Sequence, residues 1–133
     1  MSGAIFSALT GLRVLVVDDE LLVADYLEIL LQNVGCVVVG PVATVEKALA
    51  TVWGEQLDGV LLDANLNGRS SAPIADELQT RGVPFVVVTG YGKLELANPA
   101  LNDAPRLSKP FNDAEFETTL AAAFRRRGDI QVE

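Results

Sequence analysis

The stretch "RVLVVDDE", residues 13–20, ends an apolar run in three adjacent acidic side chains. The run that begins at Leu12 is rich in Val and Leu with little alternation, which is typical of a parallel strand covered on both faces. Adjacent carboxylates repel each other, by roughly 1 kcal/mol at a separation of about 4 Å in water and by several times more near a protein surface. We therefore expect a positively charged species to bind beside Asp18 and Asp19.

Similar strand-like runs recur along the chain, each followed by a helix-like stretch. Strands are expected at residues 12–17, 37–40, 59–62, 85–88 and 106–108. Helices are expected at 21–34, 44–53 and 71–82, with a last one that begins at Asn112 or Asp113. This alternation predicts a doubly wound α/β fold built on a five-stranded parallel sheet. Segment 93–105, "KLELANPALNDAP", carries two prolines and an Asn-Asp pair, so a short or mobile fourth helix is expected there.

The length and composition of the chain favour one domain. It has 133 residues, of which 50% are hydrophobic, enough for one core and too few for two ordinary domains. We expect this domain to span residues 12–127, with tails at 1–11 and 128–133. The single cysteine, Cys36, cannot form an internal disulfide, and no basic leader precedes a long apolar segment, which fits a cytoplasmic protein.

Charge and residue types exclude several classes of function. Ten Lys plus Arg against 18 Asp plus Glu give a formal net charge of −8, which disfavours binding to nucleic acid or to an anionic membrane. No apolar stretch approaches the roughly 18 residues that suggest a membrane span. The chain has no histidine, so acid–base, nucleophilic or metal chemistry based on histidine is excluded. The expected partner is a protein or a small cation.

Chemically reactive side chains follow the expected strands at their carboxyl ends. Those ends meet at one edge of a parallel α/β sheet, where ligands bind and helix N-termini point. In chain order, these side chains are Asp18, Asp19, Asp63, Thr89 and Lys109. We therefore expect three acids, one hydroxyl and one ammonium group to share a crevice.

Asp18, Asp19 and Asp63 offer only hard oxygen ligands, which suits Mg²⁺ rather than zinc or copper. A bound Mg²⁺ would offset the repulsion between the acids, and it commonly takes one or two carboxylates together with a phosphate oxygen. Asp63 could supply a nucleophile, since carboxylates form acyl phosphates in phosphoryl-transfer proteins. Lys109 would then pair with the new charge, and Thr89 would donate a hydrogen bond to a phosphoryl oxygen.

Four short motifs, "VVDDE", "LLDANLNG", "VVTGYG" and "SKPF", occur in an order that resembles the receiver domain of two-component response regulators. The resemblance covers about residues 12–127. It implies a flavodoxin-like sheet with the strand order 2-1-3-4-5 and Asp63 as the phosphoacceptor. It also implies a cis bond between Lys109 and Pro110, which needs proline because the cis form costs much less before that residue.

The same resemblance implies a complete set of site residues. Asp18, Asp19 and Asp63 would hold Mg²⁺ together with the backbone carbonyl of Asn65. Thr89 and Lys109, which the motifs also match, would sense phosphorylation and change the conformation of the domain.

Two features set this chain apart within that family. Most receivers carry Tyr or Phe three residues before the lysine, as part of the switch, whereas Arg106 occupies that switch position here. The usual aromatic switch is therefore in question. Separately, "PFVVVTGYG" resembles the signature of the FATGUY subgroup, whose members are often stand-alone, have a poorly formed fourth helix and work with kinases of the HWE or a related type.

The leading expectation is a signalling switch rather than an enzyme. It would accept a phosphoryl group on Asp63 from a histidine kinase or phosphotransfer protein and would change the surface that it presents to a downstream protein. One alternative is a Mg²⁺-dependent phosphohydrolase with an aspartate nucleophile. The other is a pseudo-receiver that binds partners without phosphorylation, which the presence of Arg106 motivates.

Several further residues are expected to have ordinary structural roles. Glu20 is interpreted as an acid favoured in a first helical turn, and Asn67 and Gly68 as turn residues. Trp53 is expected to pack within its helix face, and Cys36 to act as a small buried hydrophobe.

Overall fold

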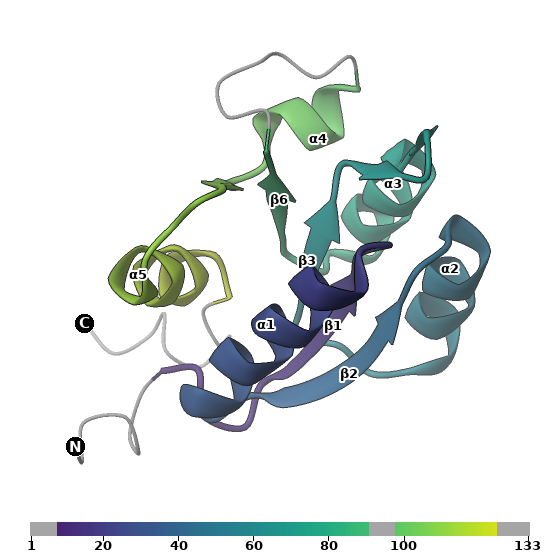
Figure 1. The fold of residues 1–133 in the computed structure, drawn as a ribbon. Coiled ribbons are helices and arrows are strands. Elements are labelled where there is room, and N and C mark those ends of the chain that lie inside the picture. Colours follow the sequence, from purple (N-terminus) through teal and green to yellow (C-terminus); the bar gives the residue numbers. More distant parts are fainter. Residues whose placement is uncertain (1–7, 91–97, 125–133) are drawn as a thin grey trace.

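The computed structural model describes residues 8–90 and 98–124 of the chain. Helices and strands alternate as expected, with one small hairpin added (Figure 1). In chain order the elements are β1 (Arg13–Val17), α1 (Leu21–Asn33), β2 (Val37–Val42), α2 (Val45–Gly54), β3 (Gly59–Asp63), β4 (Asn65–Leu66), β5 (Arg69–Ser70), α3 (Ala72–Arg81), β6 (Phe85–Thr89), α4 (Pro99–Asp103), β7 (Arg106–Ser108) and α5 (Asp113–Ala123).

The main sheet has five parallel strands in the order β2-β1-β3-β6-β7. Strands β4 and β5 form a separate two-stranded antiparallel hairpin that follows β3. Counting the main strands alone, the order is 2-1-3-4-5, which confirms the predicted flavodoxin-like sheet. The parallel arrangement brings the carboxyl ends of β1, β3 and β6 to one edge of the sheet (Figure 1).

Two apolar clusters cover the two faces of the sheet. Alternate side chains of a strand point to opposite faces. In β1, Val14 and Val16 pack with side chains of α1 and α5, whereas Leu15 and Val17 pack with side chains of α2, α3 and α4. The same division holds in β3 and β6, where every apolar side chain is buried. Burial on both faces explains why these strands show no polar alternation.

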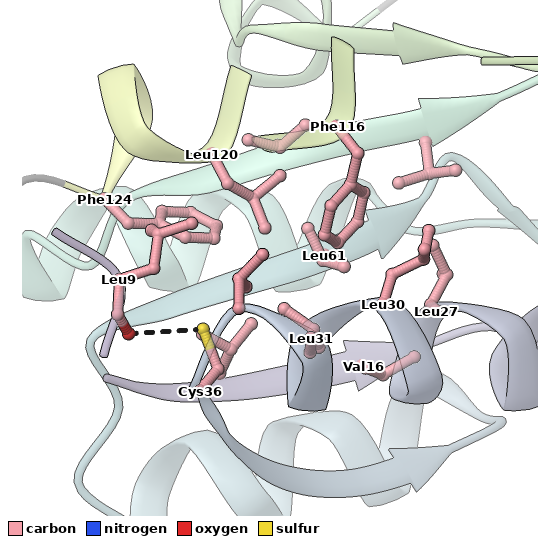
Figure 2. Close-up of a cluster of buried hydrophobic side chains, with 14 of the residues drawn as sticks. Leu9, Val16, Leu27, Leu30, Leu31, Cys36, Leu61, Phe116, Leu120 and Phe124 are labelled. Atoms are coloured by element: carbon pink, nitrogen blue, oxygen red, sulfur yellow. Dashed lines mark hydrogen bonds between the residues drawn. The ribbon is translucent and has the colours of Figure 1, made fainter. Parts of the chain in front are cut away.

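The packed region begins before the predicted domain start at residue 12. Leu9, in the segment expected to be a tail, is buried in the same cluster as Phe124 and Leu120, which lies between α1 and α5 (Figure 2). Its carbonyl oxygen accepts a hydrogen bond from the Sγ of Cys36 at 3.4 Å. An apolar residue four positions before the first strand carried no periodic signal, so its burial depends on the tertiary fold.

Cys36 is buried, as expected, and burial raises the pKa of its thiol to about 11, with the Asp58 carboxylate adding to the rise. The thiol therefore stays protonated at neutral pH. A protonated, buried sulfur is a poor nucleophile, which fits a packing role.

The fourth helix is short, as the two prolines of its segment predicted. Helix α4 has five residues and carries Pro99 in its first turn. The side chain of Asn98 caps it by accepting a hydrogen bond from the backbone N–H of Leu101 at 3.0 Å. Residues 93–97 of the same predicted segment lie outside the described residues.

Two expectations about apolar side chains were wrong. Trp53 does not pack on its helix face: it is 58% exposed, and its Nε1 donates a hydrogen bond to Glu77 Oε2 at 3.1 Å. In α1, helical spacing puts Tyr26 on the same apolar face as Leu27 and Leu30, which predicts that it is buried. Tyr26 is 44% exposed, and Leu31 is buried instead. Both errors have the same cause. Helical spacing shows which side of a helix is apolar, but the neighbouring elements decide how many side chains on that side are buried.

Helix α5 is capped by Asn112, one of the two positions at which it was expected to begin. Asn112 Oδ1 accepts a hydrogen bond from the backbone N–H of Glu115, and Glu115 Oε1 accepts one from the backbone N–H of Asn112. Replacing Asn112→Ala removes the side-chain oxygen that accepts from the backbone N–H of Glu115, so we expect the free energy of unfolding to fall by about 1 kcal/mol. Urea denaturation measures the change. The variant Asn112→Ser, which keeps a capping oxygen, should lose little, and equal losses in both variants would argue against the cap.

Candidate functional site

One pocket opens at the carboxyl ends of β3 and β6, beside the loops that follow β1 and β7. It collects side chains from four separate segments of the chain, as the strand-end prediction required. The residues that line it are Asp19, Glu20, Asp63, Asn65, Thr89, Gly90 and Lys109. Asp18 is buried, with 3% of its surface exposed, and belongs to the same carboxylate group.

Three carboxylates converge in this site. Asp18, Asp19 and Asp63 each offer one oxygen, and these oxygens lie within 4.8 Å of one another. Asp18 Oδ1 accepts a hydrogen bond from the backbone N–H of Glu20 at 2.9 Å. Within residues 8–90 and 98–124, the buried Asp18 Oδ2 has no hydrogen-bond partner. An unmatched buried carboxylate oxygen is costly, so a hard cation fits this group of oxygens.

The small hairpin holds two of the site's side chains in place. The backbone N–H of Asn67 donates to Asp19 Oδ2 at 3.1 Å, and that of Asn65 donates to Asp63 Oδ1 at 3.2 Å. Asn67 has a left-handed backbone with φ of 53°, and Gly68 follows with φ of 84°. Two such residues form the two-residue loop that suits a tight hairpin, for which Asn-Gly is a strong sequence signal.

Asn67 is therefore a site residue that the sequence reasoning missed. It was assigned only to a turn, although its Asn-Gly dipeptide could have predicted the hairpin. The contact with Asp19 spans 48 positions in the sequence and depends on how the hairpin folds back over β1. The hairpin is also tied to α2 by an ion pair between Arg69 and Glu46 at 2.7 Å.

Burial and repulsion between neighbouring carboxylates raise the pKa of two of the acids, Asp63 and Asp18. Burial raises the pKa of Asp63 to about 7, and the Asp18 and Asp19 carboxylates add to the rise. The backbone N–H of Asn65 and the Lys109 ammonium act in the opposite direction. Burial also raises the pKa of Asp18. Protons and a cation therefore compete for the same oxygens near neutral pH.

Lys109 reaches the pocket from the loop after β7. Its backbone N–H donates to the carbonyl oxygen of Thr89 at 3.0 Å, and its peptide bond with Pro110 is cis, as the resemblance implied. Its Nζ lies 3.5 Å from Glu20 Oε1. Glu20, expected to serve only its helix, thus also contacts the lysine. Thr89 is buried, with 2% exposed, at the end of β6.

Arg106 does not line the pocket. It lies on β7, paired in register with Val87, and is half-buried. Its Nη2 donates to Asn102 of α4, to Oδ1 at 3.2 Å and to the backbone oxygen at 3.4 Å. The position that carries an aromatic switch in most receivers thus connects the edge strand to α4 in this chain.

The sequence profile of the response regulator receiver domain matches residues 14–121. The chain belongs to the receiver domain family of response regulators. This confirms the family predicted from the four motifs, and a receiver domain is a signalling switch that interacts with histidine kinases or phosphotransfer proteins.

Individual relatives fit the same assignment. The receiver is 30% identical over 122 residues to the sensory transduction protein LytT of Bacillus subtilis (strain 168), an alignment that covers 90% of this chain and 51% of LytT. The solution structure of SdrG from Sphingomonas melonis Fr1 is 39% identical, with a TM-score of 0.74, over 88% of this chain and 98% of SdrG. The receiver domain of PhyR from Erythrobacter litoralis is 27% identical, with a TM-score of 0.78, over 90% of this chain and 96% of that one.

The receiver spans about half the length of the curated LytT proteins that it matches. The similarity therefore concerns about half of each LytT protein and does not assign the activity of the whole LytT protein to this receiver. None of the helices within residues 8–90 and 98–124 combines the length and the apolar character needed to cross a membrane.

Proposed function

We propose that this receiver accepts a phosphoryl group on Asp63 from a histidine kinase or phosphotransfer protein and then presents a changed surface to a downstream protein. The observation that carries the proposal is the convergence of Asp63 with Asp18 and Asp19 in a pocket that Lys109 and Thr89 also reach. Membership of the receiver family supports it. A cytoplasmic location follows from such a partner, and the free, buried Cys36 agrees with a reducing compartment.

The residues of the site suit one transfer step. A carboxylate oxygen of Asp63 attacks the phosphorus of a phosphohistidine in the partner, a P–O bond forms, the P–N bond breaks, and the imidazole nitrogen leaves with the electron pair. Lys109 would pair with a phosphoryl oxygen and Thr89 would donate a hydrogen bond to another. Mg²⁺ bound by Asp18, Asp19, Asp63 and the backbone carbonyl of Asn65 would neutralise the charge that gathers there.

The route from site to surface is proposed to run through β7. Thr89 and Lys109 are joined through their backbones, and Lys109 follows β7, whose Arg106 contacts α4. A movement of Thr89 or Lys109 toward a phosphoryl group would shift β7, and Arg106 would transmit this shift to α4. A short helix with few buried residues, such as α4, is easily displaced.

A test of the proposal uses acetyl phosphate as donor. With Mg²⁺, intact-protein mass spectrometry should show the gain of one phosphoryl group, and EDTA should prevent it. Turnover of many donor molecules per chain, with release of free phosphate at each, would favour the phosphohydrolase instead. Binding of a downstream partner that is insensitive to phosphorylation would favour the pseudo-receiver, which the missing aromatic at Arg106 makes the second candidate.

The first turn of α1 offers a docking surface next to the pocket. Leu21 and Leu22 are 75% and 82% exposed, and they directly follow Glu20 of the pocket lining. Exposed apolar side chains beside a reaction site are typical of a protein contact surface. The "PFVVVTGYG" motif favours a kinase of the HWE type as the partner that docks there.

Leu22→Ala is expected to slow phosphoryl transfer from a partner kinase by about 10-fold, the loss that follows when Leu22 is one of the few central contacts whose truncation costs more than about 1 kcal/mol. Labelling by acetyl phosphate should not change, because the small donor needs no docking surface. Rates of transfer from whichever purified, phosphorylated kinase labels the wild type give the measurement. Val37→Ala, which shortens an exposed side chain on β2, is the matched control. Equal effects of both substitutions on kinase transfer would contradict docking on α1.

A further inference from the structure

Glu20 occupies the N-cap position of α1, but its side chain makes no capping hydrogen bond. Its backbone serves the helix and the site, because its carbonyl accepts from the N–H of Ala24 and its N–H donates to Asp18. The carboxylate instead lies 3.5 Å from Lys109 Nζ. The local structure thus leaves this side chain available for a role toward Lys109.

The ion pair lies at the mouth of the pocket. The Glu20 side chain is 63% exposed, whereas that of Lys109 is 28% exposed. Among the described residues, the ion pair of Lys109 is with Glu20, and no carboxylate oxygen of Asp63 lies within the 4.0 Å that defines such a pair. Lys109 still acts on Asp63 and Asp18 at longer range, where its charge offsets part of the rise in pKa that burial causes in both acids. The lysine therefore has two competing sets of negative partners.

We propose that Glu20 is a positioning residue that holds Lys109 at the mouth of the pocket in the unphosphorylated receiver. This inference rests on the proposed function. A phosphoryl group on Asp63 would compete with Glu20 for the Lys109 ammonium. Glu20 thereby opposes the contact that stabilises the phosphorylated form, and it sets how readily the switch responds to modification.

Beryllofluoride, which mimics a phosphoryl group on aspartate, tests this competition. At saturating Mg²⁺, Glu20→Gln should bind beryllofluoride about 2- to 5-fold more tightly than wild type, the range expected for losing one partly exposed ion pair. Asp25→Asn is the matched control, because it removes one exposed carboxylate from the same helix, five positions further along. It should leave the affinity close to that of wild type. NMR titration measures all affinities.

A double-mutant cycle separates a contact with Lys109 from a general change of charge. In a Lys109→Met background, beryllofluoride should bind more weakly than to wild type, and Glu20→Gln should have no further effect. A separate readout needs neither metal nor phosphoryl analogue: the side-chain methylene resonances next to Nζ of Lys109 should move in Glu20→Gln and not in Asp25→Asn.

The outcomes distinguish the inference from the function on which it rests. If wild type binds no beryllofluoride, the proposed function fails and the competition fails with it. If wild type binds it, but Glu20→Gln and Asp25→Asn have the same affinity, the inference alone is overturned. An undiminished effect of Glu20→Gln in the Lys109→Met background would also overturn it, because the residue would then act by charge and not through the lysine.

Discussion

Asp63→Asn is expected to abolish phosphoryl labelling by acetyl phosphate in the presence of Mg²⁺. The substitution keeps the shape of the side chain but replaces the nucleophilic carboxylate with an amide, which does not form an acyl phosphate. Asp18 and Asp19 remain, but Asp18 is buried, and Asp19 Oδ2 is engaged by the backbone of Asn67. Neither is therefore placed to substitute for Asp63. Intact-protein mass spectrometry over time measures the labelled fraction.

Two controls make this result specific. Asp103→Asn removes an exposed carboxylate on α4 and should label like wild type. Thr89→Ala should also be labelled, while the chemical-shift changes that beryllofluoride causes in β7 and α4 should shrink. Labelling of Asp63→Asn on the same timescale as wild type would show that another residue is the acceptor.

Asp63→Asn is also expected to make the receiver more stable than wild type at pH 8 when no divalent cation is present. Folding raises the pKa of Asp63 from 3.8 to about 7. The folded state therefore binds more protons than the unfolded state between those values, and stability is lost as the pH rises through this window. A shift of this size in a fully buried group corresponds to about 4 kcal/mol. Because Asp63 is partly exposed, we expect about 1–3 kcal/mol after solvent screening.

Urea denaturation in EDTA at pH 4 and pH 8 tests this expectation. The difference in unfolding free energy between Asp63→Asn and wild type should be small at pH 4 and large at pH 8. Adding Mg²⁺ at pH 8 should stabilise wild type more than the variant, because a cation replaces the missing protons. If the variant is equally stable or less stable than wild type at pH 8 in EDTA, the ionised Asp63 carboxylate does not destabilise the fold, and the expectation is wrong.

The arrangement of the sheet could be predicted because each central strand is buried on both faces. Runs such as Val14 to Val17 then lack polar alternation, which indicates a parallel sheet without any knowledge of contacts. Once the sheet is parallel, the carboxyl ends of its strands share one edge. Asp63 and Lys109 could therefore be assigned to one pocket although they are far apart in the sequence.

Predictions about single side chains at the edges of the fold were less successful. Trp53 and Leu9 show this in opposite directions, because one is exposed within a helix and the other is buried ahead of the first strand. Neither outcome follows from periodicity. Each depends on which neighbouring element covers the side chain, and the sequence alone does not name that neighbour.

The amino-acid sequence by itself determined the strand pattern, the family and the residues that meet at the carboxyl edge, because these follow from hydrophobic periodicity and from short motifs. Only the tertiary structure decided how the acids are held. The N–H of Asn67 on Asp19 and the carboxylate of Glu20 beside Lys109 join segments that are distant in sequence. Such contacts depend on loop conformation and side-chain direction, which are set by packing across the whole domain.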